Sequence, residues 1–167
     1  MTSQNLENLV RIGKLKAEPP AQGEFNGLVS SARTRLGDAR NETLAVESRF
    51  DLAYNAAHAL SLAALRWNGY RCDNRYLVFQ ALEHTVKLEA TDWRLLSHCH
   101  NRRNVIEYEG SMFEDPRLLN ELIEVAGRLL DVVDGISVWH TRTTRRELKR
   151  RWRKLVATSR VRRKCSD

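Results

Sequence analysis

One stretch of the sequence, residues 50–67, constrains the fold more than any other feature because it is apolar on nearly every side of a helix. The apolar side chains are Phe50, Leu52, Ala53, Tyr54, Ala56, Ala57, Ala59, Leu60, Leu62, Ala63, Ala64 and Leu65. A helix that is hydrophobic all round has to be covered by other elements, and its many alanines allow neighbouring helices to approach closely. We expect a central helix that begins at a capping box of Ser48 and Asp51 and stops at Gly69.

The rest of the first 134 residues carries apolar side chains at the spacing of further helices. Proline should end the first of these at Pro19, Asp92 should cap the fifth, and Asp115-Pro116 should start the last, which Gly135 should end. No segment alternates for long enough to predict a strand. The expected helices, besides the central one, span about residues 6–15, 24–41, 74–87, 93–108 and 116–134.

These patterns predict an all-α protein, an antiparallel bundle of five or six helices over residues 1–134, followed by a basic tail over 135–167. The apolar run from Leu52 to Leu65 is too short to cross a bilayer. No signal peptide is visible, so we expect a cytoplasmic protein without membrane association. Three cysteines, far apart in the sequence, indicate reduced thiols and no disulfide framework.

The net charge of +7 is distributed unevenly. The segment 135–167 holds twelve Lys or Arg residues against Glu147 and Asp167, whereas the first 134 residues have a small excess of acidic groups. A helix near residues 144–158 is expected in this tail from the spacing of Thr144 and Glu147. Such a tail attracts polyanions, which in a cytoplasm are mostly RNA, DNA or ribosomes.

Ionisable residues also gather on the predicted helix 93–108, where charge needs a partner or a function. His100, Asn104 and Tyr108 lie at four-residue spacing and share a face, while Arg103 and Glu107 share another. An ordinary helix ion pair between Arg103 and Glu107 is an alternative reading of that second face.

Other histidines and motifs carry less signal. The adjacent residues His98, Cys99 and His100 would point to different sides of a helix, so we expect no metal site. His58 is expected to be a hydrogen-bonded core residue rather than a catalyst. The sequence contains no phosphate-binding loop or other cofactor motif, so no cofactor is expected.

Two segments resemble the HEPN superfamily, the small helical domains found in many prokaryotic toxin–antitoxin and defence systems. Residues 49–58 are similar to the alanine-rich central helix of that family, with an acidic residue near its start, and residues 102–108 are similar to its arginine motif. The resemblance covers about residues 24–134. It implies a homodimer in which Arg103 matches the motif arginine and Asn104 the polar residue after it. Tyr108 stands where ribonuclease members have histidine.

The resemblance implies RNA binding in a groove lined by Arg103, Asn104 and Tyr108, with metal-independent endoribonuclease activity as a further hypothesis. An unperturbed tyrosine is a poor base near neutral pH, so the change at Tyr108 puts cleavage in doubt. Asp51, His100 and Glu107 would support the site. The expected RNA-binding residues are Arg102, Arg103, Tyr108, Arg145, Arg146, Lys149, Arg150, Arg151, Arg153 and Lys154.

Two alternatives stay open. The domain could be a non-catalytic interaction module that pairs with a nucleotidyltransferase-like protein in a two-gene unit. It could instead be a helical DNA- or ribosome-associated protein whose activity resides in the tail.

Overall fold

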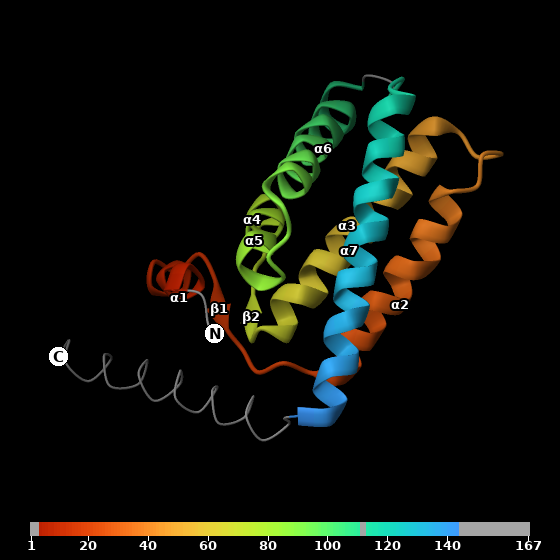
Figure 1. Cartoon of the computed structure of the whole chain (residues 1–167). Coiled ribbons are helices and arrows are strands. Elements are labelled where there is room, and N and C mark those ends of the chain that lie inside the picture. Colours follow the sequence, from red (N-terminus) through yellow and green to blue (C-terminus); the bar gives the residue numbers. More distant parts are fainter. Residues whose placement is uncertain (1–3, 111–112, 144–167) are drawn as a thin grey trace.

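The structure, a computed structural model, describes residues 4–110 and 113–143, and it is all-α apart from one short pair of strands (Figure 1). The prediction of a helical bundle is therefore confirmed. The elements in chain order are α1 (Gln4–Arg11), β1 (Lys16–Ala17), α2 (Gln22–Ala39), α3 (Val46–Trp67), β2 (Tyr70–Arg71), α4 (Arg75–Gln80), α5 (Leu82–Thr85), α6 (Ala90–Glu109) and α7 (Pro116–Thr143).

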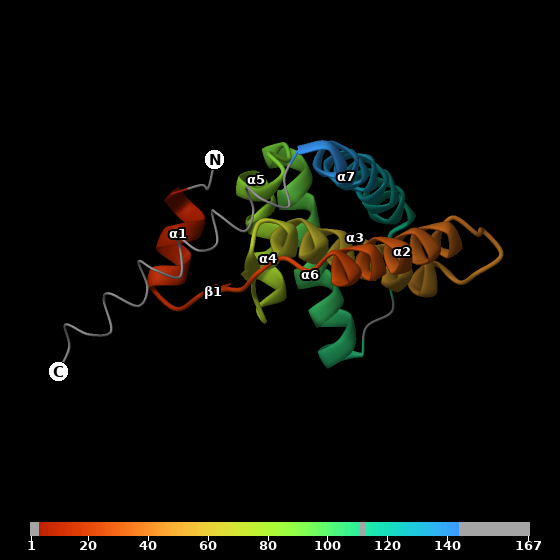
Figure 2. The same cartoon turned by 90° about the horizontal axis from the view of Figure 1, so that it is seen from below.

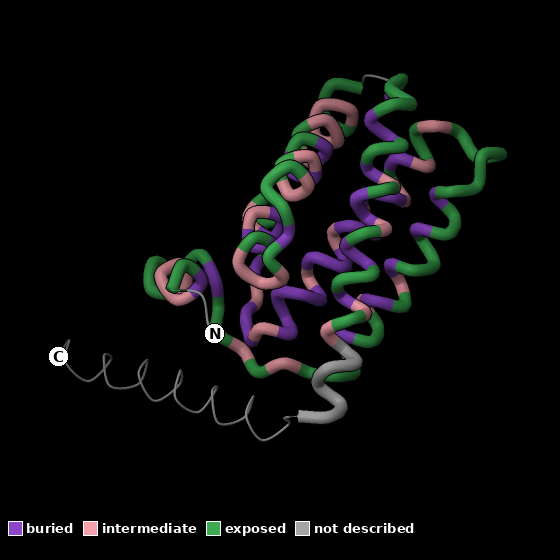
Figure 3. Tube along the Cα trace, viewed as in Figure 1, coloured by how far each residue is buried: buried purple, intermediate pink, exposed green. Residues whose placement is uncertain are grey.

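Helix α3 is the centre of the bundle, as its apolar surface predicts. It packs along α2 and α7 and also contacts α4, α5 and α6 (Figures 1 and 2). All six of its alanines are buried, and small residues of the neighbouring helices, such as Ala32 of α2 and Ala126 of α7, belong to the same core. Figure 3 shows the buried positions on the inward faces of the helices. Small side chains on both sides of an interface let helix axes come close together.

Two predicted helix starts are wrong. Helix α3 begins at Val46, and neither its N-cap, Ala45, nor any side chain there makes a capping hydrogen bond, so Ser48 and Asp51 lie inside the helix. Helix α6 begins at Ala90 and includes Asp92, whose carboxylate accepts hydrogen bonds from Arg128 instead of capping the helix. In both cases the carboxylate side chain contacts a distant helix, and short-range spacing does not reveal such a contact.

Other boundaries agree with the sequence. Asp115 caps α7, because its Oδ1 accepts a hydrogen bond from the backbone N–H of Leu118 at 2.9 Å. Gly69 and Gly110 follow α3 and α6 with φ of +86° and +66°, the left-handed conformation that glycine adopts without strain.

The remaining corrections concern where helices are interrupted and where they end. The predicted helix over residues 74–87 is divided into α4 and α5, and the first helix ends at Arg11, well before Pro19. Gly135 does not end the last helix, which continues to Thr143. The basic segment therefore begins within α7, and the expected helix over 144–158 lies outside the described residues.

A second, smaller core holds the N-terminal segment against the bundle. Strands β1 and β2 pair antiparallel, Lys16 with Arg71 and Ala17 with Tyr70, although the sequence predicted no strand. The buried members of this core are Leu6, Leu15, Leu65, Tyr70, Cys72, Val78 and Ala81. Among the described residues, no helix is long and apolar enough to span a bilayer.

Candidate functional site

The ionisable residues of α6 meet a buried tyrosine of the central helix. Tyr54 is 0% exposed, and its hydroxyl lies 2.8 Å from Nδ1 of His100. One turn further along α6, the Nδ2 amide group of Asn104 lies 3.2 Å from Nε2 of the same imidazole. His100 is thus held at both ring nitrogens, and its orientation is fixed by α3 on one side and by its own helix on the other.

Two arginines from different helices lie over the Tyr54 ring. The guanidinium carbon of Arg103, from α6, is 5.4 Å from the ring centroid, and that of Arg75, from α4, is 6.0 Å away. Cations at this distance from an aromatic face are attracted by the ring quadrupole. The rings of His58 and Tyr76 complete the group: His58 stacks on Tyr54 with centroids 6.5 Å apart, and Tyr76 lies 6.1 Å from His100.

We refer to these six residues as the Tyr54 cluster: Tyr54, His58, Arg75, Tyr76, His100 and Arg103.

The electrostatic environment of the Tyr54 cluster keeps its imidazoles neutral. Burial, and then the charges of Arg75, His100 and Arg103, lower the pKa of His58 to about 4. Burial also lowers the pKa of His100, assisted by Arg75 and Arg103. Burial raises the pKa of the Tyr54 phenol. The charges that act on both histidines are positive, which indicates a cationic field over a half-buried aromatic surface.

On its other side, Arg103 faces a small pocket of about 250 Å³ between α3 and α6. Its Nη1 donates to Oε2 of Glu107 at 2.5 Å, so the helix ion pair considered as an alternative is present. Its Nε lies 3.5 Å from Oδ1 of Asp51, and it is buried without a hydrogen-bond partner among the described residues. Glu47 also lines this pocket, which therefore contains three carboxylates and one guanidinium.

The structure brings together five of the seven predicted site residues that lie in the described part of the chain. Arg103, Asn104, His100, Asp51 and Glu107 are linked by the contacts above.

Tyr108 differs from these residues. It is 83% exposed near the end of α6 and projects from the helix into solvent, so its role stays a prediction. Arg102 is half-buried on α6, and the predicted tail residues lie outside the described residues.

Sequence reasoning missed Tyr54, Arg75 and Tyr76 as site residues. Tyr54 belongs to the apolar helix and Arg75 to a short helix that no motif marked, so only the fold brings them to His100. His58 packs against the rings of Tyr54 and Phe79. Its position at the edge of the core agrees with a structural role, although the contacts are with rings and not the expected hydrogen bond.

Metal ligands do not gather in the described part of the chain, where no group of three or more His, Cys, Asp or Glu side chains could hold an ion. On α6, His98 is exposed, Cys99 is fully buried and His100 is half-buried. The three side chains therefore point in different directions, as their adjacency in the sequence predicted. Burial raises the pKa of the Cys99 thiol to about 12, which makes it a poor ligand and a poor nucleophile.

Comparisons with family models, with curated proteins and with solved structures gave no match to this chain.

Proposed function

We propose that the protein is an RNA-binding protein of HEPN-like design and that the Tyr54 cluster is its phosphate- and base-binding surface. The observation that supports this best is the cationic field of Arg75 and Arg103 over neutral aromatic and imidazole rings. Arginine binds phosphate through its planar fork of donors, and unpaired RNA bases stack on tyrosine, histidine and arginine planes. Tyr76, 38% exposed, is the ring most available for such stacking.

The two segments that resemble the HEPN superfamily also lie side by side. Asp51, the acidic residue near the start of the alanine-rich helix, is within 3.5 Å of Arg103, the arginine of the motif. A contact between these two positions supports the interpretation of residues 102–108 as a site rather than as a solvated helix face. Tyr108, exposed beyond the cluster, would be reached by RNA or by a second copy of the chain.

Cleavage of RNA without a metal ion would need a base for the 2′-hydroxyl proton, and His100 is the residue of the cluster with suitable chemistry. Its lowered pKa leaves the imidazole neutral at pH 7, the state that accepts a proton. Both ring nitrogens have neighbours, however, since the Tyr54 hydroxyl and the Asn104 amide occupy them. One of these two contacts would have to break before His100 could accept the proton. We therefore propose RNA binding as the function, and we treat endoribonuclease activity as a hypothesis for a separate test.

The test is RNA binding by the full-length protein and by the variants Arg75→Ala and Arg103→Ala. If each arginine contacts a phosphate, each variant should bind labelled RNA several-fold more weakly and reduce the slope of log affinity against log salt by about 1. Arg117→Ala, an exposed arginine at the start of α7, is the matched control and should bind like the wild type. Incubating the same RNA in EDTA with wild type and with Arg103→Ala tests cleavage in parallel.

Affinity that does not change in the two cluster variants would contradict the proposal. Removal of residues 144–167 tests the basic tail apart from the cluster. If RNA binding is lost in the truncated protein and is unchanged in both arginine variants, the activity belongs to the tail alone.

A second candidate follows from the pocket beside Arg103. Three carboxylates line it, from Glu47, Asp51 and Glu107, and they disfavour a phosphate at that end of the cluster. A surface of mixed charge suits a protein partner, and we propose a nucleotidyltransferase-like protein of a toxin–antitoxin or defence unit as the alternative. Charge reversal by Glu47→Lys should then abolish co-purification with the product of an adjacent nucleotidyltransferase gene. The same change should not weaken RNA binding.

A further inference from the structure

A second cavity is lined by none of the six residues of the Tyr54 cluster. It occupies about 470 Å³ between α1, the α4–α5 pair and the start of α6, and Figures 1 and 2 show α1 beside those helices. Arg75 and Tyr76 of α4 belong to the cluster, while Leu77 and Gln80 line this cavity, so one short helix contributes residues to both. A volume of this size is typical of sites for small organic ligands.

Part of the cavity wall is apolar and includes an aromatic ring. Leu9, Ile12 and Leu77 line it together with Trp93 of α6. Ile12, directly after α1, is 63% exposed and is therefore accessible from solvent. An indole beside branched aliphatic side chains provides the flat, dry surface on which a planar ring binds.

Three carboxamides carried on helices, those of Asn5, Asn8 and Gln80, line the cavity. The Nδ2 amide group of Asn5 lies 3.3 Å from Nε2 of His84. Each carboxamide has both donors and an acceptor, so the group can pair with the edge of a planar heterocycle that itself presents both.

Among the described residues that line the cavity, the charges balance. Arg11 and Glu83 are the charged ones, one of each sign. A site for a divalent cation would gather carboxylates, and a site for a polyphosphate would gather several cations. The pocket thus selects an uncharged planar group, and Arg11 at its edge suits at most one phosphate.

From this combination we infer a nucleobase-binding site between α1, α4–α5 and α6, separate from the Tyr54 cluster and independent of the proposed function. The base would lie against Trp93 and Ile12 and form hydrogen bonds with Gln80, Asn8 and Asn5. The same chemistry belongs to a free nucleoside or nucleoside monophosphate and to an unpaired base in RNA.

Calorimetric titration of the full-length protein with the four nucleosides, the four nucleoside monophosphates and short single-stranded oligonucleotides tests this inference. In parallel, the indole N–H signal of Trp93, assigned through a Trp93→Phe variant, should shift on addition of the bound species. Saturable binding of free nucleosides or monophosphates would identify a small-ligand site. Saturation by oligonucleotides alone would identify an RNA base as the occupant.

The variant Gln80→Leu keeps the side-chain volume and removes the carboxamide, and it should weaken binding about tenfold, the effect of losing a hydrogen bond and leaving a polar edge unpaired. Gln22→Leu, an exposed glutamine at the start of α2, is the matched control. Nucleoside binding that is weakened by Arg103→Ala and not by Gln80→Leu would place the ligand at the Tyr54 cluster and would overturn the inference. Absence of saturable binding, or equal affinity in Gln80→Leu and wild type, would overturn the inference.

Discussion

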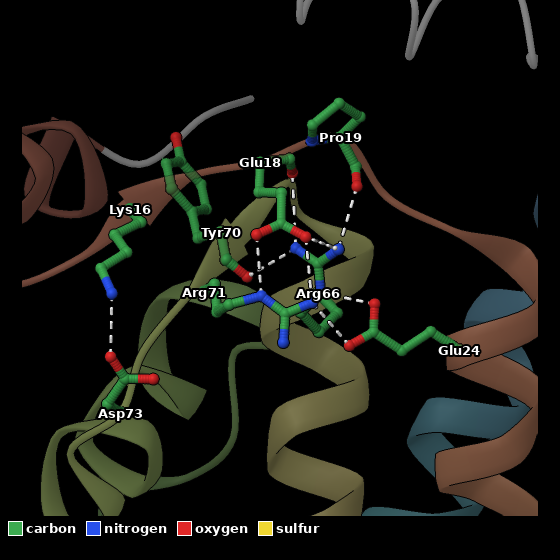
Figure 4. A network of polar contacts seen from close by, with 8 residues as sticks. All are labelled: Lys16, Glu18, Pro19, Glu24, Arg66, Tyr70, Arg71 and Asp73. Carbon is green, nitrogen blue, oxygen red and sulfur yellow. Dashed lines mark hydrogen bonds and ion pairs between the residues drawn. The ribbon is translucent and has the colours of Figure 1, made fainter.

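Arg66, in the last turn of α3, and Arg103, on α6, each pair with two carboxylates, yet their surroundings differ. Arg66 is 2% exposed, and its guanidinium donates to Glu18, Glu24 and the carbonyl oxygens of Pro19 and Tyr70 (Figure 4). The Arg103 side chain is 24% exposed, its Nε has no hydrogen-bond partner among the described residues, and one face rests on Tyr54.

The difference between the two arginines is in how many of their donor groups are already occupied. Around Arg66 the donors are saturated, and Arg71 pairs with the same two glutamates, so the four charges cancel. The hydrogen bonds of Arg71 lower the pKa of Glu18, whose proximity in turn raises the pKa of Arg71. This network fastens the segment that follows β1 to the end of α3. An arginine whose donors are all occupied has nothing to offer a ligand, whereas Arg103 still has donor capacity beside a cavity.

The largest expected effect is that of breaking the saturated network. Arg66→Met should lower the free energy of unfolding by about 3 kcal/mol or more, because Glu18 and Glu24 lose a buried counter-charge and three carbonyl groups lose a donor. Urea denaturation measures this. Arg33→Met, which breaks the exposed pair with Asp134, is the control and should cost less than about 1 kcal/mol. Equal losses in the two variants would show that burial does not distinguish these ion pairs.

The second effect is a pH dependence that arises at the Tyr54 cluster. His58 has a folded pKa of about 4 against an ordinary value of 6.5, so between these values the unfolded chain binds a proton that the folded chain does not. Stability should therefore fall as pH drops from 7 to 5, by roughly 1–2 kcal/mol from this group alone. His58→Asn should flatten that part of the curve in denaturation experiments at the two pH values. A wild-type curve already flat over this interval would contradict the burial of a neutral imidazole.

The hydrogen bond between Tyr54 and His100 gives a smaller effect. Tyr54→Phe should cost about 1 kcal/mol of stability, the typical loss when a buried hydrogen bond is removed and its partner is left unpaired. The NMR signal of the His100 ring should also shift, because the ring loses a contact at Nδ1. Tyr76→Phe removes a hydroxyl from a partly exposed ring and should change neither quantity.

Much of the fold could be predicted because hydrophobic periodicity is local information. The all-round apolar pattern of α3 predicted a central helix, Gly69 marked its true end, and Asp115 marked the true start of α7. The errors occurred where tertiary contacts decide. Asp51 and Asp92 looked like cap residues, but each pairs with an arginine of another helix, and Gly135 lies within a helix long enough to absorb it.

Only part of the candidate site could be predicted from the sequence, because tertiary contacts bring the remaining residues to it. Arg103, Asn104 and His100 lie close together on one helix, so their spacing placed them in a common region. Arg75 and Tyr54 reach them from elements 28 and 49 residues away from Arg103 in the sequence, and no local pattern links them. The saturated Arg66 network was missed entirely, because its members are ordinary surface residue types whose burial depends on how the N-terminal segment crosses α3.

The smallest expected change in stability completes the comparison. Arg103→Met should lower the free energy of unfolding by about 1 kcal/mol or less, because both carboxylate partners are about half exposed and can be solvated when the arginine is absent. The same change should reduce RNA affinity if the proposed function is correct, whereas an arginine that only stabilises the fold would affect unfolding alone. Denaturation and RNA titration of Arg103→Met beside Arg66→Met separate the two roles. A stability loss at Arg103 as large as that at Arg66 would mean that Arg103 is a structural residue like its counterpart.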